Sequence, residues 1–384
     1  MNKKIGVLGG GQLGRMLLQE VTKFDQEIWF MDNSFDTPVG RIYPYFVQGD
    51  FKSYDDVISF GSNMDIITVE IENVNTDALT KLEESGIVVR PQSRVLKTIK
   101  DKGIQKQFYL ENDIASSEFF LVTNKQDIID KISNGILVPP FVQKARTAGY
   151  DGKGVKVIYA ESDIPDIMDT PSVIEKLVDI KKELAIIVGR NAKGQKTFFP
   201  VTEMVFNKEA HLLDYLQCPA EITEETYTDC VKLADQIITN LEMIGILAVE
   251  LFLTNDGQIL VNEVAPRPHN SGHHTIDAGS HSQYNIHLRT LLDWDLPEVK
   301  QTETALMINV LGEKNHTGPT YYEGLDSILT MDKVYPHLYG KEETRPLRKM
   351  GHVNIVGENL DEVKEKMTFV KSSLKVKAWG SKSE

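Results

Sequence analysis

The stretch AVELFLTNDGQILVNEV, residues 248–264, places one glutamate inside each of two apolar runs. Such runs are typical of β-strands, and the Asp256-Gly257 pair between them is typical of a two-residue hairpin turn. Glu250 and Glu263 are equally far from that turn, so they are predicted to lie directly opposite each other on one face. Two like charges in this position destabilise a hairpin unless something lies between them.

A divalent cation is the natural group to lie between Glu250 and Glu263. Magnesium is commonly held by one or two carboxylates together with the phosphates of a substrate. A different turn length would shift the register, and each glutamate would then pair separately with a lysine. The hairpin therefore predicts a magnesium site, with two separate ion pairs as the alternative.

The N-terminal part of the chain has the order of a parallel α/β sheet. Strands are expected at 5–8, 28–31 and 66–69, and helices at 12–21, 54–60 and 77–85. Between the first strand and helix, the stretch VLGGGQLGRM (residues 7–16) fits G-x-G-x-x-G, and Asp32 follows the second strand. This pattern is typical of dinucleotide-binding proteins, so a nicotinamide oxidoreductase is one alternative.

After residue 90 the predicted secondary structure changes from alternating strands and helices to an antiparallel sheet, and then back to an α/β pattern. A lysine-rich stretch at 94–112 is predicted to be helical, and short β-rich runs between glycines at 138–200 indicate an antiparallel sheet. A helix at 221–241, with Thr223 as its cap, precedes the hairpin of strands 246–253 and 258–264. A further α/β segment follows residue 300 and ends in a helix near 360–372.

A second candidate site is KARTAGYDGKG, residues 144–154. Closely spaced glycines let the backbone approach phosphate oxygens, and Lys144, Arg146 and Lys153 add positive charge. The stretch is not a Walker A loop, because G-x-x-x-x-G-K-[ST] is absent. A simple turn is the alternative.

A third candidate site is the histidine-rich segment that begins at Arg267. Its H-x-x-x-H-H spacing is not that of a zinc protease, and no cysteine lies near it. Arg267, Asn270 and Ser271 instead suit an anion such as a carboxylate, bicarbonate or phosphate. His281 and His287 are predicted to be structural or exposed.

Composition excludes several classes of protein. The 384-residue chain has a net charge of −14, which argues against nucleic acid or an anionic membrane as the main partner. No apolar run has the length of a membrane span or signal segment. Cys218 and Cys230 lack metal or disulfide spacing and are expected to be buried thiols, so a cytoplasmic location is expected.

Six motifs occur in one order along the chain: GGGQLGRM, VEIENV, DKGIQKQF, KARTAGYDGKG, NEVAPRPHNSGHHT and RPLRKMGH. Together they resemble the ATP-grasp superfamily and, within it, the carboxyaminoimidazole ribonucleotide synthetases. Biotin carboxylases and a ribonucleotide transformylase share the paired carboxylates and the glycine lid. The transformylase, however, usually carries Asp-Thr-Gly where Asn270-Ser271-Gly272 stands.

The resemblance implies an α/β and α+β architecture: an ATP-grasp fold with an N-terminal Rossmann-like parallel-sheet domain, a central lid and a small C-terminal domain. The four units are expected at 1–95, 96–175, 176–300 and 301–384. The implied reaction is ATP- and bicarbonate-dependent carboxylation of 5-aminoimidazole ribonucleotide through carboxyphosphate, in purine biosynthesis. ATP and Mg²⁺, with Mn²⁺ as an alternative, are the implied cofactors. NAD and biotin are not expected, and a homodimer is expected by analogy.

Roles carry over from the family residue by residue. On the nucleotide, the resemblance implies Lys102 and Lys144, the lid residues Gly149, Tyr150, Asp151, Gly152, Lys153 and Gly154, the adenine segment Glu175, Lys176, Leu177 and Val178, the ribose acid Glu183, and Asn262 and Glu263. The implied metal ligands are Glu250 and Glu263. On the ribonucleotide it implies Gln12, Glu70, Tyr150, Asp151, Lys341 and Arg348, and on bicarbonate Arg267, His269 and Asn270. Asp151 is also expected to accept a hydrogen bond from the reacting amine. Ala148 departs from the family, which usually has glycine there.

Overall fold

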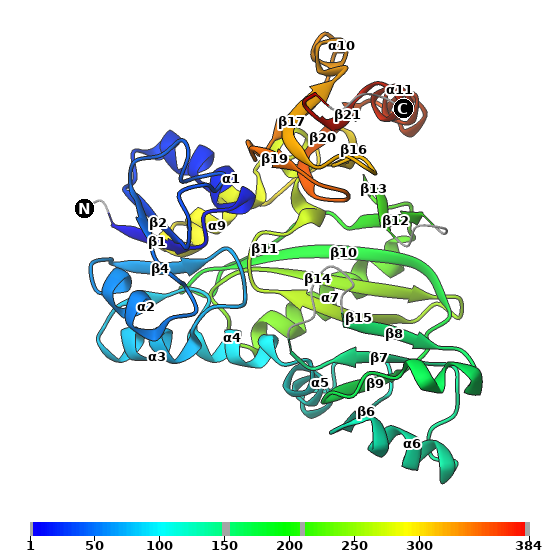
Figure 1. Ribbon diagram of the computed structural model, residues 1–384. Coiled ribbons are helices and arrows are strands. Elements are labelled where there is room, and N and C mark those ends of the chain that lie inside the picture. Colours follow the sequence, from blue (N-terminus) through cyan, green and yellow to red (C-terminus); the bar gives the residue numbers. More distant parts are fainter. Residues whose placement is uncertain (1–2, 148–153, 208–211, 381–384) are drawn as a thin grey trace.

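The computed structural model describes residues 3–147, 154–207 and 212–380. These residues form four β-sheets, of five, nine, four and three strands. Figure 1 shows the long strands of the largest sheet in the middle of the molecule. The N-terminal parallel sheet lies at one end and a small antiparallel sheet at the other, with the C-terminal segment above. This arrangement confirms the predicted ATP-grasp architecture.

The N-terminal sheet is parallel, in the order β3-β2-β1-β4-β5. Its strands are β1 (Ile5–Leu8), β2 (Ile28–Asp32), β3 (Phe46–Gln48), β4 (Ile66–Val69) and β5 (Val88–Val89). The connecting helices are α1 (Gln12–Val21), α2 (Tyr54–Gly61) and α3 (Thr76–Glu84), and the 3-10 turn η1 (Thr22–Phe24) follows α1. The predicted strands and helices are confirmed to within one residue, whereas the short strands β3 and β5 were not predicted.

Two faces of this sheet are covered in different ways. On one face, α2 and α3 pack against side chains such as Leu8 and Val69. On the other face, α1 and a helix from much later in the chain, α9 (Gln283–Leu292), share a buried cluster that includes Met16 and Tyr284. The N-terminal sheet is therefore attached to the rest of the molecule through a continuous apolar core.

The small antiparallel sheet has the order β6-β9-β7-β8. It consists of β6 (Phe119–Val122), β7 (Phe141–Ala145), β8 (Val155–Ile158) and β9 (Ser172–Lys176), with α6 (Lys125–Ser133) and η2 (Glu161–Asp166). Two helices precede it, α4 (Ser93–Lys100) and α5 (Lys102–Glu111). The predicted helical stretch is thus broken at Asp101, whose side chain accepts the backbone N–H groups of Gly103 and Ile104 and so caps α5.

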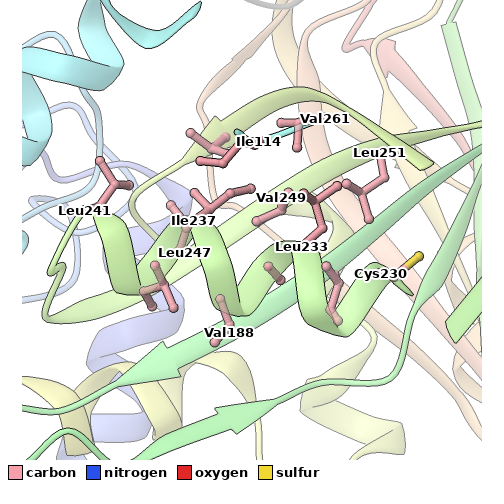
Figure 2. Close-up of a cluster of buried hydrophobic side chains, with 14 of the residues drawn as sticks. Ile114, Val188, Cys230, Leu233, Ile237, Leu241, Leu247, Val249, Leu251 and Val261 are labelled. Carbon is pink, nitrogen blue, oxygen red and sulfur yellow. The ribbon is translucent and has the colours of Figure 1, made fainter. Parts of the chain in front are cut away.

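The nine-stranded sheet has the order β15-β14-β10-β12-β13-β16-β20-β18, and β11 pairs with β10. Its strands are β10 (Ile180–Arg190), β11 (Lys196–Phe198), β12 (Thr202–Asn207), β13 (Leu212–Cys218), β14 (Gly245–Thr254), β15 (Ile259–Ala265), β16 (Thr304–Leu311), β18 (Val334–Leu338) and β20 (Lys349–Gly357). Helix α7 (Glu224–Asn240) covers β10, β14 and β15 through one apolar face (Figure 2). Thr223 caps this helix as predicted, by accepting the N–H of Thr226.

The remaining elements complete the C-terminal part. They are η3 (Asn270–Gly272), α8 (Thr275–Ala278), β17 (Gly318–Glu323), α10 (Leu325–Leu329), β19 (Glu343–Thr344), α11 (Leu360–Ser373) and β21 (Lys375–Ala378). Strand β16 pairs with β13, so the large sheet runs without a break into this part of the chain. The division into four units with borders at 95, 175 and 300 stays a prediction.

Both cysteines are buried and free, as predicted. Burial raises the pKa of the Cys230 thiol to about 12 and that of the Cys218 thiol further still. Within residues 3–147, 154–207 and 212–380, no helix combines the length and hydropathy that crossing a bilayer requires.

Candidate active site

Glu250 and Glu263 are directly paired across β14 and β15, as the sequence predicted, but the predicted turn is wrong. Thr254 donates its N–H to the carbonyl of Gln258 over 3.0 Å, so the loop has three residues rather than two. Gly257 closes the loop with a φ of +89°, a conformation that favours glycine. A loop of this length would by itself shift the register by one residue.

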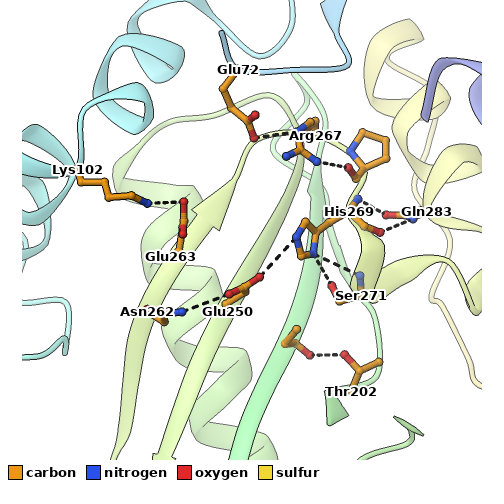
Figure 3. Close-up of polar contacts among 12 residues, drawn as sticks. Glu72, Lys102, Thr202, Glu250, Asn262, Glu263, Arg267, His269, Ser271 and Gln283 are labelled. Carbon is orange, nitrogen blue, oxygen red and sulfur yellow. Dashed lines mark hydrogen bonds and ion pairs between the residues drawn. The ribbon is translucent and has the colours of Figure 1, made fainter. Parts of the chain in front are cut away.

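A β-bulge at Asn262 restores the register. Leu251 lies opposite Val261, whereas Glu250 lies opposite Glu263, so Asn262 is the extra residue. Its amide nitrogen donates to Glu250 Oε2 over 3.2 Å, which places the Asn262 side chain beside the carboxylates (Figure 3). The bulge therefore both aligns the two glutamates and adds an amide to the site.

The environment of the two glutamates differs. The pKa of Glu250 is raised to about 7 by burial and then by the charges of Glu263 and Glu183. Glu263 is half exposed, and its Oε1 accepts from Lys102 Nζ over 2.5 Å. The alternative of two separate lysine pairs is therefore correct only for Glu263. This residue pairs with Lys102, and it still lies opposite Glu250.

Across the described parts of the chain, no group of three or more His, Cys, Asp or Glu side chains is arranged to hold a metal ion by itself. Two carboxylates are nevertheless enough for magnesium when substrate phosphates supply other ligands. The mutual repulsion of Glu250 and Glu263 fits such an ion.

A buried ion pair lies beside this hairpin, in the small sheet. Lys144 Nζ from β7 lies 3.0 Å from Glu175 Oε2 on β9 and donates to Asn262 Oδ1 over 2.9 Å. Asn262 therefore links Lys144, the lysine predicted to bind the ATP phosphates, to the pair of Glu250 and Glu263. Beyond Glu175, the predicted adenine residues Lys176, Leu177 and Val178 lead from β9 towards β10 in the large sheet.

Glu183 lies on β10, opposite Phe252 of β14. Burial raises its pKa to about 7, and the nearby charge of Lys144 acts in the other direction. Its charge also acts on Glu250. The predicted ribose acid and the predicted metal ligand are therefore neighbours on the same sheet.

The segment after β15 brings Arg267 and His269 to the same place (Figure 3). Arg267 Nε lies 2.8 Å from Glu72 Oε1, and His269 Nε2 lies 3.5 Å from Glu250 Oε1. Gln283 holds the backbone of His269 on both sides, since it accepts the N–H and donates to the carbonyl, each over 2.8 Å. The next residue, Asn270, begins the short turn η3.

Backbone N–H groups of the glycine motif at the start of α1 donate to a carboxylate side chain of the protein, that of Glu70. Glu70, which follows β4, accepts the N–H of Gly11 over 2.6 Å and that of Leu13 over 3.3 Å. A Cβ atom at Gly11 would lie 2.2 Å from Glu70 Oε1. Asp32, the expected ribose acid of a dinucleotide site, accepts the N–H of Gly10. Glu70 thus occupies the helix N-terminus on which a dinucleotide would place its phosphates.

Three domain families match successive parts of the chain. They are the ribonucleotide synthetase preATP-grasp domain at 1–100, the ATP-grasp domain at 107–284 and the phosphoribosylaminoimidazole carboxylase C-terminal domain at 305–366. The chain is 32% identical to the phosphoribosylaminoimidazole carboxylase of Ogataea methanolica, over 97% of its own length and 70% of the relative's. It spans 66% of the length of several other fungal and plant carboxylases of the same name.

Solved structures match over nearly the full length. The N5-carboxyaminoimidazole ribonucleotide synthetase of Thermotoga maritima is 35% identical, with a TM-score of 0.89 over 98% of this chain and 99% of the other. The chain belongs to the N5-carboxyaminoimidazole ribonucleotide synthetase family. The synthase of Aspergillus clavatus, in complex with ADP and 5-aminoimidazole ribonucleotide, is 27% identical, with a TM-score of 0.87 over 97% and 98% of the two chains.

In this synthetase family member, the two C-terminal cations of the prediction lie near each other. Lys341 Nζ donates to the carbonyl of Lys349 over 2.7 Å, and Arg348 donates to that of Glu343 over 2.5 Å. Burial, and then the charge of Arg348, lower the pKa of Lys341 to about 8. The charge of Glu70 also acts on Lys341, so the N-terminal and C-terminal parts face each other here.

Part of the predicted site of this synthetase lies outside the described residues: Ala148, Gly149, Tyr150, Asp151, Gly152 and Lys153. Gly154 is described, with a φ of +80°, and its carbonyl accepts the N–H of Ala145 over 2.8 Å. Gln12 is the first residue of α1 and is half-buried.

Sequence reasoning missed three site residues: Lys106, Ser117 and Glu72. Lys106 is four residues after Lys102 and shares its helix face, a spacing that could have indicated it. Glu72 belongs to the quoted motif VEIENV, but nothing local indicated Arg267 as its partner. Ser117 carried no local signal, because its contact with Glu175 spans 58 positions of sequence.

Of the histidines after His269, His273 and His287 are buried and contact other side chains of the protein. His287 is buried and its Nε2 lies 3.2 Å from the hydroxyl of Thr68, which confirms a structural role, and His281 is partly exposed. His273 is buried and stacks on His352, which in turn stacks on His337. These rings join the segment between η3 and α8 to strands β20 and β18 of the nine-stranded sheet.

Proposed function

We propose that this chain is an N5-carboxyaminoimidazole ribonucleotide synthetase. It uses ATP and bicarbonate to carboxylate the exocyclic amine of 5-aminoimidazole ribonucleotide, and it releases ADP and phosphate in purine biosynthesis. One observation carries the proposal: the chain matches synthetases from end to end while its tertiary structure brings the paired glutamates, Lys144 and Arg267 into one region.

The nucleotide would lie between the small sheet and the hairpin of β14 and β15. Lys102 and Lys144 would face its phosphates and Glu183 its ribose, while backbone groups of the segment from Glu175 to Val178 would meet adenine. Gly154 and the preceding lid residues would cover the phosphates. Glu250 and Glu263, beside Asn262, would hold Mg²⁺, with Mn²⁺ as an alternative. When bound, the ion would neutralise charge on the phosphates.

Bicarbonate would be held by Arg267, His269 and Asn270. Arginine offers a planar fork that matches a carboxylate or bicarbonate. In the first step, a bicarbonate oxygen attacks the γ-phosphorus of ATP, the bond to the ADP oxygen breaks, and carboxyphosphate and ADP form. No protein nucleophile is required, because such transfer depends mainly on alignment and charge stabilisation.

In the second step, the exocyclic amine bonds to the carboxyl carbon of carboxyphosphate, or to the carbon of CO₂ released from it; phosphate leaves and the amine loses one proton. Lys341 and Arg348 would hold the 5′-phosphate of the ribonucleotide, and Gln12, Glu70 and Tyr150 would contact the rest of it. Asp151 would accept a hydrogen bond from the amine. Lid closure would keep water from carboxyphosphate. A homodimer, a cytoplasmic location and a four-unit division complete the proposal by analogy with the family.

Phosphate release tests the proposed function. It is measured with ATP, bicarbonate and 5-aminoimidazole ribonucleotide present together, and again with each one omitted in turn. We expect full turnover only with all three, and a product that carries label from ¹⁴C-bicarbonate. Release that ignores the ribonucleotide, or a melting temperature that rises with NAD(P)H rather than with ATP and magnesium, would contradict the proposal.

A further inference from the structure

Lys106 is a charged side chain that the scheme above does not use, although it is almost fully buried. It lies on α5, and only 2% of its surface is exposed. Its Nζ lies 3.3 Å from Glu175 Oε1 and donates to the hydroxyl of Ser117 over 2.9 Å. A buried ammonium is costly unless it is paired and hydrogen-bonded, and Glu175 and Ser117 supply both.

Glu175 stands between two lysines. Its Oε1 faces Lys106, whereas its Oε2 faces Lys144 at 3.0 Å and accepts the hydroxyl of Ser117 over 2.8 Å. Both nearby lysines lower the pKa of the Glu175 carboxyl, against the opposite effect of burial, so it is ionised at neutral pH. The three charges sum to one net positive charge.

Lys144 is the member of this triad, Lys106, Glu175 and Lys144, that can reach a ligand. An ammonium has three N–H donors. Among the described residues, Glu175 and Asn262 are within reach of two of them, which leaves one for a further acceptor. Without Lys106, Glu175 and Lys144 would form a neutral pair, and the attraction of Lys144 for an anion would fall.

We propose that Lys106 is a positioning residue for the nucleotide: it shares the Glu175 carboxylate, so that Lys144 keeps both its place and a net positive charge towards the phosphates. This inference rests on the proposed function, which places phosphates at Lys144. Lys106 itself touches no substrate, since Glu175 and Ser117 enclose its ammonium.

A purely structural role predicts a different result. A buried ion pair is often replaceable by apolar side chains without loss of stability, so packing alone does not require a lysine here. If the role of Lys106 were purely structural, its replacement would lower the melting temperature and would weaken the binding of all substrates to a similar extent. A positioning Lys106 affects the nucleotide alone.

The test compares Lys106→Met, Glu175→Gln and the double variant Lys106→Met/Glu175→Gln. The double variant removes one positive and one negative charge, so it keeps the net charge of the triad. Titration calorimetry with ADP and Mg²⁺ gives the Kd, and steady-state kinetics give KM for ATP and for 5-aminoimidazole ribonucleotide separately. The matched control is Lys196→Met, which removes a partly buried, ion-paired lysine bonded to Asp235 far along the large sheet.

We expect Lys106→Met to raise the Kd for ADP and the KM for ATP about tenfold, with the KM for the ribonucleotide unchanged. The double variant should regain most of the loss. Unchanged ADP binding by Lys106→Met, or a double variant as weak as the single one, overturns the inference.

Two further outcomes keep the test decisive. If Lys106→Met does not fold, Glu175→Gln is compared with the double variant, because both carry glutamine at position 175 and differ only in the charge of residue 106. Weaker ADP binding by the double variant supports the inference, and equal binding overturns it. If the wild-type protein binds no ADP at all, the proposed function fails before the role of Lys106 is reached. If the wild-type protein binds ADP and Lys106→Met binds it equally well, only the positioning role of Lys106 is ruled out, and the proposed function stands.

Discussion

Glu72 and Arg267 form an ion pair of 2.8 Å between the loop after β4 and the segment after β15. Both side chains are mostly buried, at 24% and 21% exposure. The pair joins the N-terminal sheet to the nine-stranded sheet at the residue proposed to hold bicarbonate. Glu70, proposed to contact the ribonucleotide, is two positions from Glu72, so one loop would serve both proposed substrate sites.

Replacing Glu72 by glutamine should loosen Arg267 without removing it. We expect the KM for bicarbonate to rise about tenfold, because a charged partner no longer orients the guanidinium. ADP binding should stay unchanged. Steady-state kinetics with varied bicarbonate measure the effect, and Glu84→Gln, a surface acid of α3, is the control. An equal loss for ATP and bicarbonate would contradict this role.

Glu263→Gln should lower the rate of ADP formation at least about 100-fold. The substitution removes one carboxylate from the proposed magnesium site while it keeps size and hydrogen-bonding capacity. Because Glu263 is half exposed, the melting temperature should stay near that of the wild type. The exposed Glu298→Gln is the matched control. Retained turnover at saturating magnesium would remove Glu263 from the site.

Alanine at Lys341 and Arg348 should weaken binding of the ribonucleotide. Each cation is expected to bind the 5′-phosphate, and loss of one charge-assisted contact corresponds to about a tenfold to hundredfold rise in KM. The KM for ATP should change little. Lys232→Ala, an exposed lysine of α7, is the control. The assignment is wrong if both substrates are affected equally.

Glu70 should make the stability of the ligand-free protein depend on pH. Its pKa is raised from 4.5 to about 7, chiefly by burial, despite hydrogen bonds from the Gly11 and other backbone amides. The folded protein therefore holds this proton to higher pH than the unfolded chain does. The contribution to the free energy of unfolding is complete below about pH 4.5 and is lost as pH rises through about 7.

Urea unfolding between pH 5 and 8, which covers most of the range from 4.5 to about 7, tests this linkage. Over that range the free energy of unfolding should fall by about 2 to 3 kcal/mol. Glu70→Gln resembles the protonated side chain, so its free energy of unfolding should fall less over this range than that of the wild type. Exposed Glu118→Gln should leave the wild-type slope unchanged. Parallel curves for Glu70→Gln and wild type would rule out the shift.

Local patterns determined much of this protein. Strands β1, β2 and β4 of the N-terminal sheet and helix α7 follow from apolar periodicity and capping residues, because these depend on neighbours within a few positions. The facing of Glu250 and Glu263 was also predicted, but for a partly wrong reason: a longer loop and the Asn262 bulge compensate each other. The three-residue loop and the bulge carry no strong local sequence signal. A bulge in particular depends on what both strands pack against.

Tertiary structure alone decided which polar side chains meet. Three pairs show this: Lys106 with Glu175, Glu72 with Arg267, and Lys144 with Asn262. The members of each pair are distant in sequence and come from different helices, strands or loops. The strands β3 and β5 were likewise missed, since two or three residues carry too little periodicity. Sequence specified the side chains and local elements, whereas packing of three sheets specified the partners, because pairing of buried charges depends on distances that only the folded chain sets.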